Sequence, residues 1–471
     1  MRAVSPSLAS TGRLRAFQRC GPGVAILLAG VAVAPGRAAA QAQRADAAVQ
    51  AFTNAVLIDG TGTAVVEHAT IVVRGDRIVS AGPAASVTVP GGARVADLRG
   101  KVLMPGLADM HVHLMGGWDG VATDMLGYRR YLNALLYAGV TTVLDTGNVE
   151  PFIVQLRAEV AAGRLLGPRI YCVGPLIDGA DPAWPPLSRA VPSVAQVPDV
   201  VRALSRDHVD LIKAYVGLSH PVLERLVEEG HKVSLRVIID QWQRNGSPDL
   251  VADGIYGFAH LPTRKLTSAD VELMHDRQIA FISTLTVFES QSRRRLAKLA
   301  FMQDPLVRDT SPPAFLDGLR AEAGRQLTSE EVEKAKRWVG LLQNAMANAR
   351  GLYQSGVLLT AGTDAPYPGD MQGEGLHREL ELLVEAGFTP LEAISIATQN
   401  AARFIGANDW GTIQPGKLAT LIIVDGRPDR DISQTRKVVG VYVAGRQIDR
   451  GSLRLARQND PGFEPISPVD F

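Results

Sequence analysis

The sequence predicts an α/β fold, a (β/α)8 TIM-like barrel with a small β-sandwich domain built from both termini. Its 471 residues, 46% of them hydrophobic, are enough to bury a large core. Eight short apolar runs alternate with longer helix-like segments between residues 107 and 363. Parallel strands covered on both faces read as near-continuous apolar runs, and eight of them with intervening helices are typical of a barrel.

The first forty residues are expected to be a secretory signal peptide and not part of the fold. Four arginines precede an apolar run at residues 24–34, and small residues follow at 38–42. This order is typical of an export signal, and the apolar run is too short to span a bilayer. We therefore expect a periplasmic or secreted protein without a membrane span after the signal is removed.

Charge and cysteine content exclude two classes of protein. Residues 1–40 hold five arginines and no acids, so their removal changes the net charge from +1 to −4. This balance does not favour nucleic-acid binding. Cys172 is then the only cysteine, which excludes an internal disulfide, and its apolar surroundings predict a buried strand position.

The flanks of the barrel are expected to form the sandwich, with residues 41–104 as its N-terminal part and residues 411–471 as its C-terminal part and tail. Gly75-Asp76 is a hairpin signal between two strand-like runs, and Gly445 marks another turn. The strand-like runs of the two flanks are 52–59, 69–73, 77–80, 419–425 and 438–443.

The barrel is assigned to residues 105–410. Its helices have local signals, because Thr389 with Glu392 and Thr328 with Glu331 each form a capping box. The eight strand runs are 107–114, 140–146, 169–174, 209–216, 232–239, 255–261, 279–286 and 357–363.

The first strand run carries a His-x-His pair. Side chains alternate along a strand, so Asp109, His111 and His113 are expected on one face. Two imidazoles in this arrangement form a bidentate corner for a divalent metal. The chain has nine histidines, so such a pair by itself is also compatible with chance.

Three further residues fall near the C-terminal ends of strands, where barrel enzymes carry their functional side chains. Lys213 interrupts an apolar run, His260 ends the sixth strand and Asp364 follows the eighth. Taken singly, Lys213 can extend to solvent, His260 can be a core histidine and Asp364 can cap a helix. Together with the His-x-His pair they predict a metal site at this rim.

The order of these residues, with residues 101–107 before them, resembles the amidohydrolase superfamily and especially its imidazolonepropionase-like and Xaa-Pro dipeptidase-like members. The resemblance covers essentially the whole mature chain and is specific for the superfamily, but not for a substrate. It includes residues 362–365, 379–383, 397–402 and 413–417.

The resemblance implies a role for each rim residue. His111, His113 and Asp364 would hold a first metal ion, usually Zn²⁺. Lys213 would be carboxylated by carbon dioxide, and its carbamate would bridge to a second divalent ion. His260 and a histidine that ends the fifth strand would hold this second ion.

The sequence lacks the histidine expected on strand five, and Arg236 is assigned to its position. His231 precedes the strand, and an arginine has no lone pair for a metal. In one interpretation Arg236 replaces the second cation and pairs with the Lys213 carbamate or a substrate carboxylate, which leaves one well-formed metal site. In the other, the metal site has decayed.

We therefore expect an exported, metal-dependent amidohydrolase that cleaves an amide, peptide-like or cyclic amide C–N bond with a metal-activated water, with Asp364 as the base. The alternative is a catalytically decayed barrel that binds a small molecule in the periplasm. Substrate contacts are expected from Arg236, from Tyr215 beside Lys213, and from Trp184 in the proline-rich loop 178–186. A homo-oligomer is compatible with the sequence.

Overall fold

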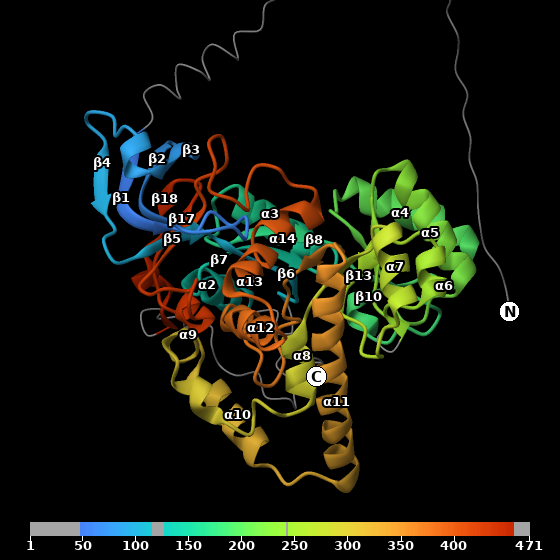
Figure 1. Ribbon diagram of the computed structural model, residues 1–471. Coiled ribbons are helices and arrows are strands. Elements are labelled where there is room, and N and C mark those ends of the chain that lie inside the picture. The colour runs from blue at the N-terminus through green and yellow to red at the C-terminus, as the bar shows by residue number, and fades with distance from the viewer. Residues whose placement is uncertain (1–47, 115–126, 242–243, 456–471) are drawn as a thin grey trace, which may run out of the picture. The chain divides into compact units, whose positions relative to one another are not determined.

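The computed structural model describes residues 48–114, 127–241 and 244–455 (Figure 1). The predicted signal peptide and the end of the tail lie outside these ranges. Within them, no helix combines the length and the apolar character needed to cross a membrane.

Strands from both flanks share one eight-stranded sheet, in the order β18-β17-β16-β5-β1-β2-β3, with β4 paired to β1. Figure 1 shows the blue N-terminal strands beside the red C-terminal ones. Antiparallel pairing of β16 with β5, with Ile422 opposite Met104, joins the two flanks. The strands are β1 Val49–Leu57, β2 Val66–Arg74, β3 Arg77–Pro83, β4 Arg94–Asp97, β5 Val102–Pro105, β16 Leu421–Val424, β17 Val438–Val443 and β18 Arg446–Gln447.

Both predicted turns are hairpins in the structure. Residues 75–76 connect β2 to β3, where Arg74 pairs with Arg77. Ala444 and Gly445, with φ of 47° and 76°, connect β17 to β18. Two consecutive residues with positive φ match the twist of a hairpin. A sheet built from both flanks is thus confirmed, whereas its packing as a two-layered sandwich stays a prediction.

All eight predicted barrel strands are present, each inside its predicted run, and they lie in two parallel sheets. The first sheet holds β6 Leu107–Val112, β7 Val140–Asp145 and β8 Arg169–Cys172. The second has the order β10-β9-β11-β12-β13-β14-β15. Its strands are β9 Leu176–Asp178, β10 Ser188–Ala190, β11 Ile212–Ala214, β12 Val237–Ile239, β13 Gly257–Phe258, β14 Ala280–Ile282 and β15 Leu359–Thr360.

Backbone hydrogen bonds connect the two parallel sheets at two places. Met110 N donates to Ala361 O at 2.9 Å, which joins β6 to the segment after β15. Asp210 N donates to Cys172 O at 2.8 Å, which joins β8 to the segment before β11. Cys172 itself is fully buried, as expected from its apolar run.

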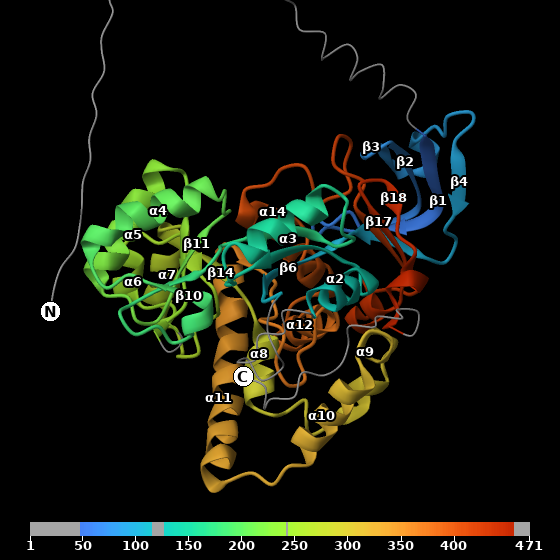
Figure 2. The same cartoon turned by 180° about the vertical axis from the view of Figure 1, so that it is seen from behind.

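Helices lie between successive barrel strands along the chain, with several helices in a row after β14 and after β15 (Figure 2). Thr328 and Glu331 form the predicted capping box of α11, and Thr389 with Glu392 forms that of α13. The α-helices are α2 Tyr128–Tyr137, α3 Phe152–Ala161, α4 Val197–Arg206, α5 His220–Lys232, α6 Pro248–Ala252, α7 Ser268–Asp276, α8 Leu285–Gln291, α9 Pro305–Arg308, α10 Pro313–Gly324, α11 Ser329–Gln354, α12 Glu374–Glu385, α13 Pro390–Ile396 and α14 Gln399–Ile405.

Candidate metal centre

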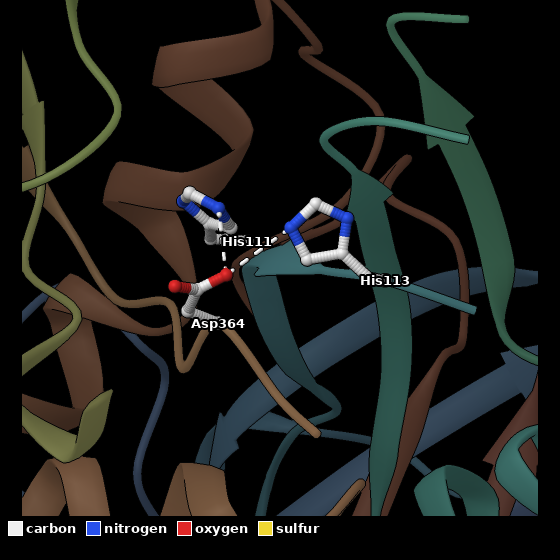
Figure 3. Close-up of side chains that lie close together, drawn as sticks. All are labelled: His111, His113 and Asp364. Carbon is white, nitrogen blue, oxygen red and sulfur yellow. Dashed lines mark ion pairs between the residues drawn. The ribbon is translucent and has the colours of Figure 1, made fainter. Parts of the chain in front are cut away.

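The His-x-His pair at the end of β6 faces the aspartate that follows β15 (Figure 3). The Nε2 atoms of His111 and His113 lie 3.2 and 3.1 Å from Asp364 Oδ1. These three side chains form a group whose ligand atoms all lie within 4.8 Å of one another. Three residues that are distant in sequence thus meet at one point.

Backbone carbonyl groups set the orientation of both imidazoles. His111 Nδ1 lies 2.9 Å from Ala259 O, and His113 Nδ1 lies 2.9 Å from Gly147 O. A carbonyl oxygen only accepts hydrogen bonds, so Nδ1 carries the ring proton and the neutral ring has its lone pair on Nε2. Two lone pairs and a carboxylate oxygen then converge, which is a donor set suited to a divalent cation.

The electrostatics favour the metal-binding state of His111 and Asp364, whereas at His113 burial is outweighed by the contact with Asp364, which raises the pKa of this imidazole. Burial, and after it the charge of Lys213, lowers the pKa of His111 to about 3, so this imidazole is neutral at pH 7. Burial alone would raise the pKa of Asp364, but the polar side chains around it, with the largest effect from His111, hold it well below its usual range. Asp364 also has a left-handed backbone, with φ of 70°, a strained conformation that often occurs at functional sites.

Asp109 holds the backbone around this centre by hydrogen bonds and is not one of the three grouped ligands. Its carboxylate accepts hydrogen bonds from Thr363 N at 3.0 Å, Thr363 Oγ1 at 2.8 Å and His111 N at 3.2 Å. These bonds connect the residue before Asp364 to the strand that carries His111. Burial raises the pKa of Asp109 to about 8.

A second polar group lies beside the first. Lys213 Nζ is 3.2 Å from His111 Nε2 and 3.8 Å from Asp240 Oδ2. His260 Nε2 is 3.0 Å from the same Asp240 oxygen and 3.9 Å from Asp364 Oδ2. The side chains of Lys213, Asp240 and His260 are at most 2% exposed. The structure thus brings together all five residues predicted as metal ligands.

The placement of Arg236 at this rim is wrong. Arg236 precedes β12, and the β11–β12 register puts Lys213 opposite Ile238. The Arg236 guanidinium carbon lies 4.1 Å from the centre of the Tyr256 ring, and the Tyr256 hydroxyl donates to Phe404 O. Arg236 therefore packs at the N-terminal end of its strand, where it is unsuited to replace a second cation or to bind substrate at the rim.

The residue that ends strand five is Asp240, which the sequence reasoning missed. It directly follows Ile239, the last residue of β12, and is buried beside His260. Burial opposes its ionisation, but the charge of His260 lowers the pKa of Asp240 to about 2. The rule that strand C-termini carry functional residues would have found it. The family resemblance implied a histidine at this position, although a carboxylate also binds metals.

The two aromatic residues predicted to contact substrate lie together near the second polar group. Trp184 Nε1 donates to Tyr215 Oη at 2.9 Å, and the Tyr215 ring centre is 5.7 Å from Lys213 Nζ. Tyr367, three residues after Asp364, was not predicted as part of this region. Burial, and then the charge of Asp364, raises the pKa of Tyr367 well above its usual value.

Comparison with known proteins agrees with this fold. Adenine deaminase 2 from Rhizobium etli is 26% identical over 436 residues, which cover 89% of this chain and 61% of that protein. The chain thus spans about 61% of the length of this relative. Imidazolonepropionase from Deinococcus radiodurans is 25% identical over 400 residues, 82% of this chain and 93% of that protein.

Among solved structures, a Xaa-Pro dipeptidase with bound methionine has a TM-score of 0.68. It is 22% identical, and the match covers 85% of this chain and 100% of that one, which shows a shared fold. The amidohydrolase family model matches residues 102–221 and 320–448, more than half of the sequence. The chain belongs to the amidohydrolase family.

Proposed function

We propose that this protein is a metal-dependent hydrolase that cleaves an amide, peptide-like or cyclic amide C–N bond in a small molecule. The observation that carries the proposal is the convergence of two imidazole Nε2 atoms on one Asp364 oxygen. Family membership supports it, and the relatives named adenine deaminase and imidazolonepropionase are consistent with C–N bond chemistry.

His111, His113 and Asp364 would hold the first cation, for which this donor set favours Zn²⁺. Such a cation supplies Lewis-acid activation of a water nucleophile and of the scissile group. Asp364 Oδ1 faces the histidines, whereas Oδ2 faces His260 at 3.9 Å. We assign to Oδ2 the task of accepting the proton of the attacking water and passing it to the leaving nitrogen.

Lys213, Asp240 and His260 would form a second cation position. Arg236, which was expected to replace the second cation, lies at the other end of β12. Asp240 instead contributes a carboxylate, 3.0 Å from His260 Nε2. Carboxylation of Lys213, as the family resemblance implies, would add anionic oxygen donors to this set. We therefore propose two positions, the first richer in nitrogen and the second richer in oxygen.

Two broader features belong to the proposal. The backbone hydrogen bonds between the parallel sheets support one closed (β/α)8 barrel, because they join β6 to the segment after β15 and β8 to the segment before β11. The basic, apolar and small-residue order of residues 1–42 supports export. N-terminal sequencing of protein recovered from the periplasm or medium tests export, and an intact N-terminus there would contradict signal cleavage.

Metal removal and reloading test the activity. Protein stripped with a chelator should hydrolyse no member of a panel of N-acyl amino acids, dipeptides and cyclic amides. Readdition of Zn²⁺ should restore release of amine and bind at least one equivalent per chain. Full activity in the metal-free protein would overturn the proposal. A folded chain that binds no Zn²⁺ would instead favour the small-molecule binding protein.

A further inference from the structure

One buried carboxylate ties together the chain segments after β9 and β11. Asp178 Oδ1 accepts hydrogen bonds from Gly179 N at 2.8 Å and from Gly217 N at 2.7 Å. Its second oxygen accepts one from Ala183 N at 2.9 Å. Asp178 is fully buried, so these bonds are protected from competition with water. We call these two segments, residues 179–187 and 215–219, the clamped loops.

The backbones of the clamped loops are in direct contact. A Cβ placed on Gly179 would lie 2.2 Å from the Gly217 carbonyl oxygen, and one on Gly217 would lie 2.8 Å from Asp178 Oδ1. Both positions therefore require glycine at this close approach. Tyr215 N also donates to Ile177 O at 2.8 Å. The two loops thus form one rigid unit.

This unit carries two aromatic rings beside the candidate metal centre. Trp184 directly follows Ala183, whose N–H group Asp178 holds. Its Nε1 donates to Tyr215 Oη at 2.9 Å, and the Tyr215 ring centre lies 5.7 Å from Lys213 Nζ. Trp184 remains partly exposed, whereas Tyr215 is 5% exposed. Part of the Trp184 side chain therefore remains accessible.

We propose that Trp184 and Tyr215, held by Asp178, form a preformed aromatic wall that selects substrates with a planar aromatic group next to the scissile C–N bond. This inference rests on the proposed function and names its substrate class. Planar rings gain by offset or edge-to-face packing on Trp and Tyr side chains. Since the clamped loops are already ordered, little conformational entropy is lost when a ligand binds.

Binding of benzamide and acetamide to the zinc-loaded full-length chain tests the wall without requiring turnover. Ligand-observed NMR should show benzamide binding about tenfold more tightly than acetamide, since one aromatic contact contributes up to about 1.5 kcal/mol. Trp184→Ala should remove most of this difference in affinity. Trp184→Phe, which keeps a planar ring, should retain most of it and serves as the matched variant.

Asp178 is a positioning residue and needs a readout beyond stability. Asp178→Asn places an amide nitrogen where an acceptor is needed, so it should lower the benzamide-to-acetamide ratio while melting curves still show a folded chain. Equal binding of the two amides to the wild type, or an unchanged ratio in Trp184→Ala, would overturn the inference. A retained ratio without zinc-dependent hydrolysis would contradict the proposed function and leave the wall supported.

Discussion

Arg236 and Asp240 lie at opposite ends of the same short strand, β12, and have very different surroundings. Arg236 packs over Tyr256, whose hydroxyl donates to the backbone at Phe404. Asp240 lies within 3.8 Å of Lys213 Nζ and 3.0 Å of His260 Nε2. The three residues of β12 thus separate a packing role from a place in the candidate metal centre. In parallel strands the chain direction decides which of the two a polar residue takes.

The same contrast extends to neighbouring strands. Buried polar side chains gather at the C-terminal ends of β6, β11, β12, β13 and β15. At the N-terminal end of β8, Arg169 instead pairs with Asp409, with Nη1 3.4 Å from the Asp409 Oδ1 atom. Substitutions at the first end should therefore change metal binding and turnover, and substitutions at the second end should change stability alone.

The largest effect is expected for His113→Ala. Removal of one of two nitrogen donors should eliminate tight Zn²⁺ binding and with it all measurable hydrolysis. Metal analysis of the purified variant after dialysis measures the loss. His231→Ala, at an exposed histidine of α5, is the matched control and should keep its zinc. Wild-type zinc content in His113→Ala would exclude this residue as a ligand.

Asp364→Asn should lower kcat about a thousandfold, because the amide accepts no proton from the attacking water. The amide oxygen still faces His111 and His113, so zinc content should fall less than in His113→Ala. Steady-state kinetics and metal analysis on the same preparation separate the two effects. Turnover that stays at the wild-type level would remove Asp364 from the role of base.

Asp240→His should change the cation preference of the second position. An imidazole in place of the carboxylate should strengthen binding of a second Zn²⁺ relative to Mn²⁺ about tenfold, because nitrogen ligands suit zinc and oxygen ligands suit manganese. Competitive metal titration measures the ratio. Arg236→His introduces an imidazole at the other end of β12 and should leave the ratio of Zn²⁺ to Mn²⁺ affinity unchanged. Equal shifts of this affinity ratio in both variants would contradict the difference between the two ends of β12.

Glu379 of α12 binds the segment that follows β14 and should make the free energy of unfolding depend on pH. Its carboxyl accepts hydrogen bonds from Ser283 Oγ and from Thr286 N at 2.8 Å. Burial raises the pKa of Glu379 to about 7, from an ordinary 4.5. The folded chain therefore binds this proton more tightly than the unfolded chain. The resulting stability is fully present below about pH 4.5 and is lost as the pH rises through about 7.

The contribution of Glu379 to the free energy of unfolding should fall by on the order of 3 kcal/mol as the pH rises through this range. Thermal unfolding of the wild type and of Glu379→Gln at pH 5, 6, 7 and 8 tests it. The wild type should lose stability relative to the variant across this range. Parallel curves for the two proteins would show that Glu379 does not titrate in the folded chain.

The smallest effect is expected for Arg236→Ala. Loss of the contact with Tyr256 should cost about 1 kcal/mol of the free energy of unfolding. Turnover and zinc content should stay as in the wild type, because the side chain lies at the far end of β12 from Asp240. A substantial loss of kcat in a folded Arg236→Ala protein would contradict the division between the two strand ends.

Local sequence was enough to place the eight strands, both hairpins and the capping boxes. Apolar runs, turn residues and Thr-x-x-Glu spacing act within a few residues of chain, so their effect survives without tertiary information. It was also enough for His111, His113, Lys213, His260 and Asp364, whose positions follow from where strands end.

The end of strand five was decided by the tertiary structure. The apolar run 232–239 showed that a strand exists, but α5 extends to Lys232 and β12 begins only at Val237. Hydrogen bonding to β11 and β13 sets those limits, and it places Asp240 at the rim and Arg236 at the other end. The bond between Trp184 and Tyr215 likewise joins two loops that are distant in sequence. Such contacts depend on which strands become neighbours, and local patterns do not contain that information.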